Sequence, residues 1–245
     1  MARSADRVLL DLVADLQGIL DLDEFRRELL DAVGRAVPAD WVSLNDIGPG
    51  PEDVVALIDP PLEPKWVELF SAHAHENPLL VYWMATRDGR AYRFTDVADP
   101  AELADRALFR EFYEPLGVRH QISFTLPSTA PERVLAVALS RKRRNFSDRE
   151  RDLLDRARPF LIQGYRTALA FAELNARLAA ERALPHERLI ALGLTAREAD
   201  VAVEVARGGS NASIARTLRI SARTVQKHLQ HAFAKLGVAS RAEAA

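Results

Sequence analysis

Three helix starts follow one another closely between residues 195 and 222, and they limit this part of the chain to short helices joined by tight turns. Thr195 and Glu198 have the spacing of a capping box, in which each side chain bonds the backbone N–H of the other residue. Ser210 and Ser221 can cap the two later helices, and Gly237 can end the last one in a left-handed conformation. A short helix, a tight turn and a longer helix form the arrangement of a helix-turn-helix.

Charge is distributed unevenly along the sequence. The 245 residues hold 33 Lys and Arg against 35 Asp and Glu, and a net charge of −2 taken alone argues against a nucleic-acid partner. Residues 194–245, however, hold eight basic and four acidic side chains, and no acid stands between Glu204 and Glu243. A basic segment attached to an acidic body indicates a polyanionic partner, although a solvated helical face gives the same pattern.

The motifs of residues 194–241 resemble those of the LuxR-type DNA-binding domain. They are LTxRE at 194–198, SNxxIAxxL at 210–218, and SxxTVxxH followed by KLGVxSR between 221 and 241. The match runs without a gap. The resemblance implies a four-helix, all-α domain that binds double-stranded DNA with its third helix in the major groove.

The resemblance also implies which residues contact DNA. Gln226, Lys227 and Gln230 fall where the family reads base edges, since glutamine can pair with adenine and lysine can donate to guanine. Val225 is expected against a thymine methyl group. The other members of the set are expected at phosphates, which fix position rather than sequence. The full set is Ser210, Asn211, Arg223, Thr224, Val225, Gln226, Lys227, Gln230 and Lys235.

Three positions depart from the family pattern. Gly209 replaces an apolar side chain, and Arg219 stands at a turn position where the family often has glycine. If that turn needs a positive φ, arginine there costs about 1 kcal/mol. Ser240 is the expected cap of a fourth helix, but only five residues follow it. Because that helix often helps the family's module to dimerise, dimerisation through this module is in doubt.

The N-terminal region predicts an alternation of helices and strands. Residues 22–47 read as a helix and a strand, 53–59 as a strand, and 64–76 as a helix. A helix capped by Asp99 is expected to run to about Tyr113, strands are expected at 121–126 and 133–140, and a capping box at Ser147 opens a helix at 148. This order resembles a GAF- or PAS-like sensor, most closely over residues 133–161. The predicted fold class is therefore α+β: a GAF/PAS-like antiparallel-sheet domain, a linker helix and the all-α helix-turn-helix domain.

Aromatic residues are concentrated between positions 66 and 113, which hold nine of the 17 in the chain. A pocket rich in aromatic side chains with a few polar groups typically holds a small molecule, although a plain hydrophobic core gives the same composition. The candidate pocket residues are Trp66, Phe70, Asn77, Tyr82, Trp83, Tyr92, Phe94, Phe112 and Tyr113.

A narrower interpretation compares this stretch with acyl-homoserine-lactone receptors. Trp66, Phe70, Asn77-Pro78 and Phe94-Thr-Asp96 resemble that family's Trp, Tyr, Asp-Pro and Trp-Ser-Asp. Phe70 lacks a tyrosine hydroxyl, Phe94 lacks an indole N–H, and Asn77 replaces a carboxylate. Each hydrogen bond lost to the lactone head group costs about 1 kcal/mol. This reading is therefore kept only as an alternative.

The domain boundaries follow from these patterns. Residues 1–147 are predicted as the sensor domain, 148–186 as a helical linker, and 187–245 as the DNA-binding domain. Pro159 is expected to break or kink the linker helix. Leu154, Leu161 and Ala168 are spaced seven apart, which fits either pairing of this helix in a homodimer or packing onto the sensor domain.

Competing classes of function have little support. The chain has no cysteine, Gly-rich phosphate loop or GxSxG motif, so no catalytic residue, metal ligand or cofactor is assigned. We find no signal peptide and no apolar run of the roughly 20 residues that a membrane span needs, which predicts a cytoplasmic protein without membrane contact. The sequence thus predicts a DNA-binding transcription regulator that is not an enzyme. Its N-terminal domain senses a small apolar or aromatic effector or, alternatively, only contacts another protein.

Overall fold

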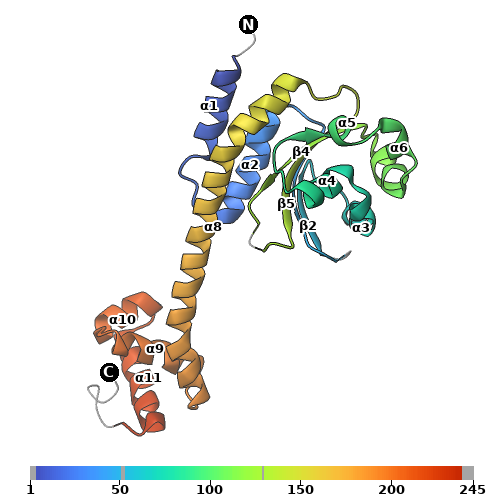
Figure 1. The fold of residues 1–245 in the computed structure, drawn as a ribbon. Helices are drawn as coiled ribbons and strands as arrows, with labels where there is room; N and C mark the ends of the chain where they lie inside the picture. The colour runs from blue at the N-terminus through green and yellow to red at the C-terminus, as the bar shows by residue number, and fades with distance from the viewer. Residues whose placement is uncertain (1–3, 51–52, 129, 239–245) are drawn as a thin grey trace. The chain divides into compact units, whose positions relative to one another are not determined.

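The computed structural model describes residues 4–50, 53–128 and 130–238, and the side chains of residues 180–185 lie outside the description. Contacts within the chain divide it into two units, residues 1–172 and 173–245. The first holds a five-stranded sheet with helices, and the second is helical (Figure 1). The predicted α+β fold class is confirmed. The bounds of the three predicted domains stay predictions.

The first unit begins with two helices and ends in the long helix α8. Its elements are α1 (Ala5–Leu16), α2 (Leu22–Ala36), β1 (Trp41–Ile47), β2 (Val54–Asp59), α3 (Pro64–His73), η1 (Ala74–Glu76), α4 (Pro78–Thr86), β3 (Tyr92–Arg93), α5 (Phe94–Val97), α6 (Pro100–Ala104), η2 (Phe109–Tyr113), α7 (Glu114–Leu116), β4 (His120–Leu126), β5 (Val134–Arg141) and α8 (Asp148–Ala191).

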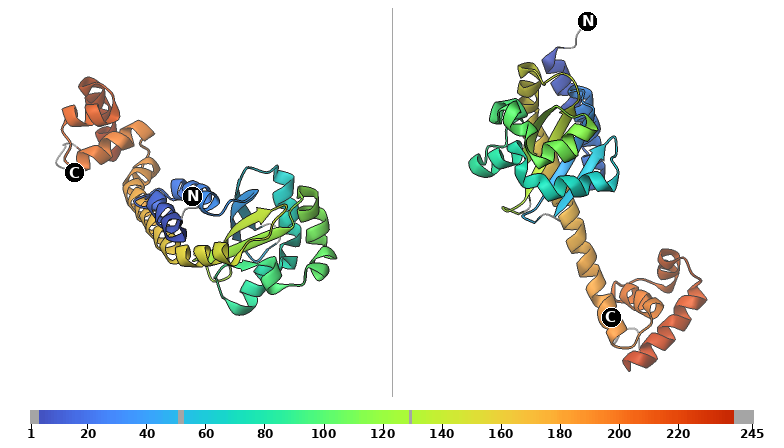
Figure 2. Two further views of the ribbon diagram at one scale, coloured as in Figure 1. Left: turned by 90° about the horizontal axis from the view of Figure 1, so that it is seen from above. Right: turned by 90° about the vertical axis from the view of Figure 1, so that its right-hand side faces the viewer.

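The sheet is antiparallel throughout, with the strand order β2-β1-β5-β4-β3. Its two faces have different neighbours: α2 and α8 lie on one side, and α3 and α4 lie on the other (Figures 1 and 2). Side chains alternate between the faces along each strand. In β4, for example, Ile122, Phe124 and Leu126 belong to the core under α2 and α8, whereas Gln121, Ser123 and Thr125 face α3 and α4.

The core under α2 and α8 explains the heptad spacing of α8. Leu154, Leu161 and Ala168 are each no more than 1% exposed and pack with Phe25 of α2. This heptad therefore packs onto its own N-terminal core, which is one of the two explanations that the sequence left open. Pro159 does not end the helix, which continues from Asp148 to Ala191. Figure 1 shows that α8 bends in its yellow, N-terminal part.

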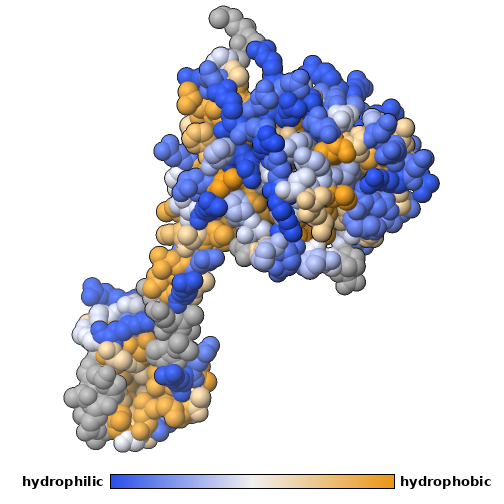
Figure 3. All heavy atoms as spheres, viewed as in Figure 1, coloured by the Kyte–Doolittle hydropathy of each residue, from blue (hydrophilic) through white to orange (hydrophobic). Residues whose placement is uncertain are grey.

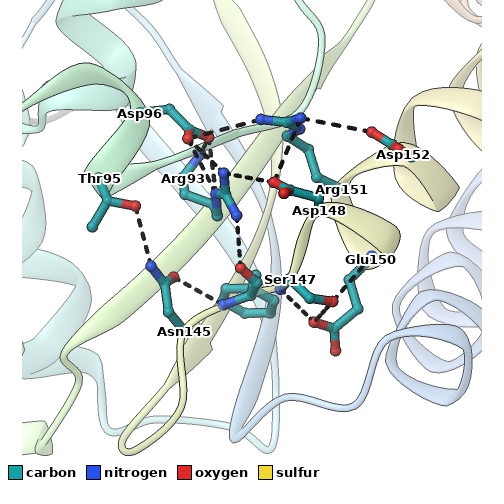
Figure 4. A network of polar contacts seen from close by, with 10 residues as sticks. Arg93, Thr95, Asp96, Asn145, Ser147, Asp148, Glu150, Arg151 and Asp152 are labelled. Carbon is teal, nitrogen blue, oxygen red and sulfur yellow. Dashed lines mark hydrogen bonds and ion pairs between the residues drawn. The ribbon is translucent and has the colours of Figure 1, made fainter.

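A polar network fixes the start of α8 against the segment after β3 (Figure 4). Arg93 donates to Asp96 and to the carbonyl of Phe146 at 2.9 Å, and it forms an ion pair with Asp148 at 3.1 Å. The predicted capping box is present, because Glu150 accepts from the backbone N–H of Ser147 and Ser147 caps in return. Burial raises the pKa of Glu150, but hydrogen bonds from Arg141 and Ser147 outweigh it and hold the value at about 2.

One predicted helix is wrong in its extent. The helix capped by Asp99 ends at Ala104, and a π-helical turn over Phe109–Tyr113 follows instead of a continuous helix to Tyr113. Arg106 and Glu76 hold this break: the Arg106 guanidinium donates to the Glu76 carbonyl, and the Glu76 carboxylate accepts from the N–H of Leu108. Contacts between residues 30 and 32 positions apart in sequence thus end the helix, where local propensity predicts that it continues.

The second unit contains three short helices after the end of α8. They are α9 (Ala196–Ala206), α10 (Asn211–Leu218) and α11 (Ala222–Leu236). The caps predicted at Thr195, Ser210 and Ser221 are confirmed, and Gly237 has φ 70° at the end of α11. The predicted fourth helix, starting at Ser240, lies outside the described residues. Two apolar clusters hold these helices together; the larger contains Val201, Val205, Ile214, Val225 and Leu229.

Candidate ligand pocket and nucleic-acid interface

A cavity lies between the sheet and helices α3 and α4 of the first unit. The volume of this cavity is about 860 Å³, including the part that is open to solvent. The floor consists of pocket-facing residues from β1, β2, β4 and β5, and the walls come from α3, α4 and the turn before β4. Small side chains such as those of Ala136 and Ala138 leave this space open. The residues paired with them on β4, Thr125 and Ser123, are small as well.

Six of the nine predicted pocket residues line this cavity. Trp66 and Phe70 come from α3, and both rings contact Phe112, at centroid distances of 6.2 and 5.4 Å. Trp83 of α4 lines it as well. The remaining two, Asn77 and Tyr113, are polar and deeply buried.

Three predicted pocket residues do not line the cavity. Tyr82 and Tyr92 pack on each other at a centroid distance of 4.6 Å, and the Tyr92 hydroxyl donates to Asp88. Phe94 is 3% exposed and packs against Phe109 and Tyr113. Phe94 is thus a core residue, Tyr92 packs at the edge of the same core, and Tyr82 is half-buried against Tyr92. None of the three lines the cavity, so their assignment to the pocket is wrong.

Asn77 and Tyr113 form a chain of hydrogen bonds inside the protein. The Asn77 side-chain oxygen accepts from the N–H groups of Leu79 and Leu80, which caps α4, and its nitrogen donates to the Tyr113 hydroxyl at 2.9 Å. Tyr113 in turn donates to Gln121. Burial raises the pKa of Tyr113 well above its ordinary value, so the phenol keeps its proton. Asn77 is therefore engaged in holding α4 and the wall of the pocket.

The polar floor of the cavity is what sequence reasoning missed. Trp41, Ser43 and Asn45 of β1, Ser123 and Thr125 of β4, and Ser140 of β5 face the cavity. A signal was present in β1, where Trp41, Ser43 and Asn45 alternate with the buried Val42 and Leu44. Such alternation indicates two different faces of a strand. It does not tell which face covers a cavity.

The second unit presents an exposed face of α11. Arg223, Gln226, Lys227 and Gln230 are exposed and recur at intervals of three and four, which places them on one side of the helix. Within residues 130–238, neither Arg223 nor Lys227 has an ion-pair partner. Ser210 caps α10 by accepting from the N–H of Ser213, and Asn211 is the first residue of that helix.

Three of the predicted DNA contacts are engaged inside the unit. Val225 is 0% exposed and belongs to the core, so its expected contact with a thymine methyl is wrong. Lys235 lies apart from the exposed set and pairs with Glu198 at 2.6 Å. The hydroxyl of Thr224, which is half-buried, shares a hydrogen bond with Ser221 at 2.7 Å.

No helix in the described part of the chain is long and apolar enough to cross a membrane. Among the same residues, no group of three or more His, Asp or Glu side chains is arranged to hold a metal ion.

Comparisons with known proteins identify the second unit. Residues 192–245 match the family of bacterial regulatory proteins of the luxR family. YhcZ of Bacillus subtilis, an uncharacterized transcriptional regulatory protein, is 52% identical over 52 residues, which are 21% of this chain and 24% of YhcZ. Mb0914c of Mycobacterium bovis, named as an HTH-type transcriptional regulator, is 54% identical over 50 residues, which are 20% of this chain and 6% of that protein. The chain thus spans a quarter or less of these relatives.

Solved structures extend the likeness to the first unit. The LBD domain of VqsR from Pseudomonas aeruginosa has a TM-score of 0.50 and 17% identity, and the match covers 68% of this chain and 96% of that one. This likeness shows a shared fold. SdiA of Escherichia coli matches over 98% of this chain and 94% of its own, with 19% identity and a TM-score of 0.45. Because of the match over residues 192–245, together with the capped helices and apolar core that residues 194–238 form, the chain carries towards its C-terminus a domain of the luxR family of bacterial regulatory proteins.

Proposed function

We propose that this protein is a sequence-specific DNA-binding transcription regulator of the cytoplasm, and not an enzyme. The observation that carries the proposal is the exposed face of α11. It presents Arg223, Gln226, Lys227 and Gln230 on a capped helix-turn-helix, in a segment without a single acid from residue 205 to 242. Cations without acidic neighbours attract phosphates, and glutamines on the same face can pair with adenine.

The roles of these residues can be separated by binding measurements. Arg223→Ala is expected to weaken binding to all duplexes about equally and to reduce the salt dependence by about one counterion. Gln226→Ala and Gln230→Ala are expected to relax the choice of base at single positions by about 1–3 kcal/mol each. Arg197→Ala removes an exposed cation that pairs with Asp200 on α9, and it is the matched control.

The experiment is selection of bound duplexes from a randomised pool by the full chain, followed by titration of the selected duplex at several salt concentrations. A selected consensus that loses definition with Gln226→Ala or Gln230→Ala supports the proposal. Two results would contradict it: no enrichment of any sequence, or a loss of affinity from Arg197→Ala as large as that from Arg223→Ala.

A homodimer is the second part of the proposal, and α8 supplies the support. Phe160, Phe171, Leu174 and Leu178 are 54%, 40%, 54% and 41% exposed. Phe171, Leu174 and Leu178 follow one another at intervals of three and four residues. Phe160 lies 11 residues before Phe171, and Thr167 divides that distance into seven and four. Such intervals are typical of the seam of a coiled coil. The seam is distinct from the Leu154, Leu161 and Ala168 stripe, which is buried in the N-terminal core. Figure 3 shows apolar side chains along the exposed part of α8. A second copy of α8 would cover them.

The first unit is proposed to sense a small molecule, with support from the cavity on the sheet. An acyl-homoserine lactone is the less favoured effector, because Asn77 is occupied as a helix cap and Phe70 brings no hydroxyl to the cavity. The alternative is a first unit that only contacts proteins. Mass spectrometry of small molecules released from the purified protein distinguishes the two: a stoichiometric compound supports the sensor, and an empty extract together with the absence of binding to the probes below contradicts it.

A further inference from the structure

The cavity of the first unit is lined without charge. Among the described residues, 25 side chains line it, and none of them is Asp, Glu, Lys, Arg or His. Moving an ionised group from water into such surroundings is costly, because neither a counter-charge nor a full set of hydrogen bonds replaces its hydration. A molecule that enters this cavity is therefore selected for neutrality.

The floor offers hydroxyl donors that the protein does not use. Within the described part of the chain, the side chain of Ser123 has no hydrogen-bond partner, although the residue lines the cavity. The hydroxyl oxygen of Thr125 lies instead beside Gly89 and the guanidinium of Arg158. The Ser140 hydroxyl accepts from Gln121 at 3.0 Å, which leaves its own hydrogen to donate. Unused hydroxyl hydrogens at a cavity surface are complementary to an acceptor oxygen, such as a carbonyl.

The amide groups, by contrast, already donate to protein acceptors. Asn45 donates to the hydroxyl of Ser43 at 2.8 Å and to the carbonyl of Ala136 at 3.4 Å. Asn77 donates to Tyr113 and Gln121 donates to Ser140. The hydroxyl groups of Ser123 on β4 and Ser140 on β5 are therefore the part of the floor that is free to donate to the polar end of a ligand.

The walls of the cavity determine the shape of the apolar end of the ligand. Trp41, Trp66, Phe70, Trp83 and Phe112 surround the space, and the two α3 rings meet Phe112 tilted or edge-on. Aromatic rings prefer these arrangements, and an additional ring can join them in the same way. Because these five rings surround one space, the cavity suits a flat ring that packs among them.

From these three observations we propose that the cavity binds an uncharged aromatic molecule that carries a hydrogen-bond acceptor, and that it rejects the anion and the cation of the same skeleton. The acceptor lies over Ser123, and the ring lies among the tryptophans. This inference rests on the proposed sensor function and specifies the chemistry of its ligand.

The protein carries its own reporter for this binding. It has three tryptophans, and all three line the cavity. Their fluorescence, excited where a phenyl ring does not absorb, therefore reports on the cavity alone. The probes are 2-phenylacetamide, phenylacetate and 2-phenylethylamine at neutral pH, which share one ring and differ in charge. A saturable change with the amide, and binding of both ions at least about tenfold weaker, is the expected result.

A variant tests the place of the acceptor. Ser123→Ala is expected to weaken the binding of 2-phenylacetamide about two- to tenfold, which corresponds to the loss of one hydrogen bond. It should leave the binding of toluene unchanged, because toluene has no acceptor. Thr86→Ala, which removes an exposed hydroxyl at the end of α4 outside the cavity lining, is the control and should leave the binding of both compounds unchanged.

Three outcomes would overturn the inference. They are an ion that binds as tightly as the amide, an amide that shows no saturable binding, and a Ser123→Ala variant that binds toluene and the amide more weakly by the same factor. DNA binding by the same samples is measured in parallel. Intact DNA binding with a failed probe series rejects the ligand class and leaves the regulator function standing, whereas a chain that binds no DNA contradicts the function itself.

Discussion

The ammonium group of Lys235 lies 2.6 Å from Oε2 of Glu198, a carboxylate whose side chain is only 5% exposed. The same carboxylate accepts from the backbone N–H of Thr195 and so closes the first turn of α9. One side chain thus completes a capping box and ties the C-terminal part of α11 to the start of α9. Lys235 acts here as a structural residue of the helix-turn-helix.

The contribution of Glu198 to stability is expected to depend on pH. The hydrogen bonds from Lys235 and from the Thr195 backbone lower the pKa of Glu198 from 4.5 to about 2. A lowered pKa means that the stabilisation is complete above the unfolded value and is lost as the pH falls towards the folded value. The difference in urea midpoint between the wild type and Glu198→Gln should therefore be constant above about pH 5 and shrink between pH 4.5 and 2.

Lys235→Met provides the internal check on this pH dependence. Without the ammonium group, the pKa of Glu198 should rise towards its ordinary value, and the loss of stability should shift to higher pH. A wild-type and Glu198→Gln difference that is the same at every pH would contradict the proposed ion pair.

Replacement of Arg219 by glycine is expected to stabilise the second unit. Arg219 ends α10 with φ 54°, a left-handed conformation in which an L side chain is strained by about 1 kcal/mol. Glycine adopts this conformation without strain, so Arg219→Gly should raise the free energy of unfolding by about 1 kcal/mol. Urea denaturation measures it. Arg216→Gly, inside the same helix, is the control and should be destabilising, and a loss of stability from Arg219→Gly would show that the side chain holds a contact worth more than the strain.

Replacement of Gly164 by alanine is expected to destabilise the first unit. A Cβ atom at this position of α8 would lie 2.7 Å from Cε2 of Phe25, which is fully buried. The overpacking costs about 1–3 kcal/mol, and the better helix propensity of alanine offsets roughly 1 kcal/mol of that. Thermal unfolding of Gly164→Ala measures the loss. In a Phe25→Leu background the added cost of Gly164→Ala should largely disappear; if it persists, the ring is not its cause.

The oligomeric state tests the seam on α8. Leu174→Glu places a charge on the exposed apolar row, and it should convert a dimer into a monomer in sedimentation equilibrium at the same protein concentration. Ala176→Glu introduces the same charge two residues later, about 200° around the helix, at an exposed position outside the seam. It should leave the dimer intact. A monomeric wild type, or equal dissociation by both variants, would reject α8 as the interface.

Local sequence signals predicted the features that are determined locally. The caps at Thr195, Ser210 and Ser221 follow from side chains that reach only three residues along the chain. Val225 could also have been placed correctly, because it stands four residues before Leu229, and both lie on the apolar stripe of α11. The family position alone implies a base contact for Val225, and this contact is wrong because the residue is 0% exposed.

The features that escaped prediction depend on residues far apart in sequence. The partner of Lys235 is 37 positions away, and the break before Phe109 needs Glu76 and Arg106. The floor of the cavity follows from the strand order, since Ser43, Ala138 and Ser123 become neighbours only when β1, β5 and β4 pair. Hydrophobic periodicity gives each strand two faces, but it carries no information on which strands lie side by side.

The alternation along β1, β4 and β5 has a consequence for how such a protein can change over evolutionary time. Ser123 and Ala138 face the cavity, while their chain neighbours Ile122 and Leu139 belong to the core that holds α2 and α8. Mutation at one set of positions changes the lining of the cavity, and mutation at the other changes how firmly the domain holds together. Selection can therefore reshape the cavity while the packed side of the same strands stays constant, so descendants of one ancestor can acquire differently lined cavities without a new fold.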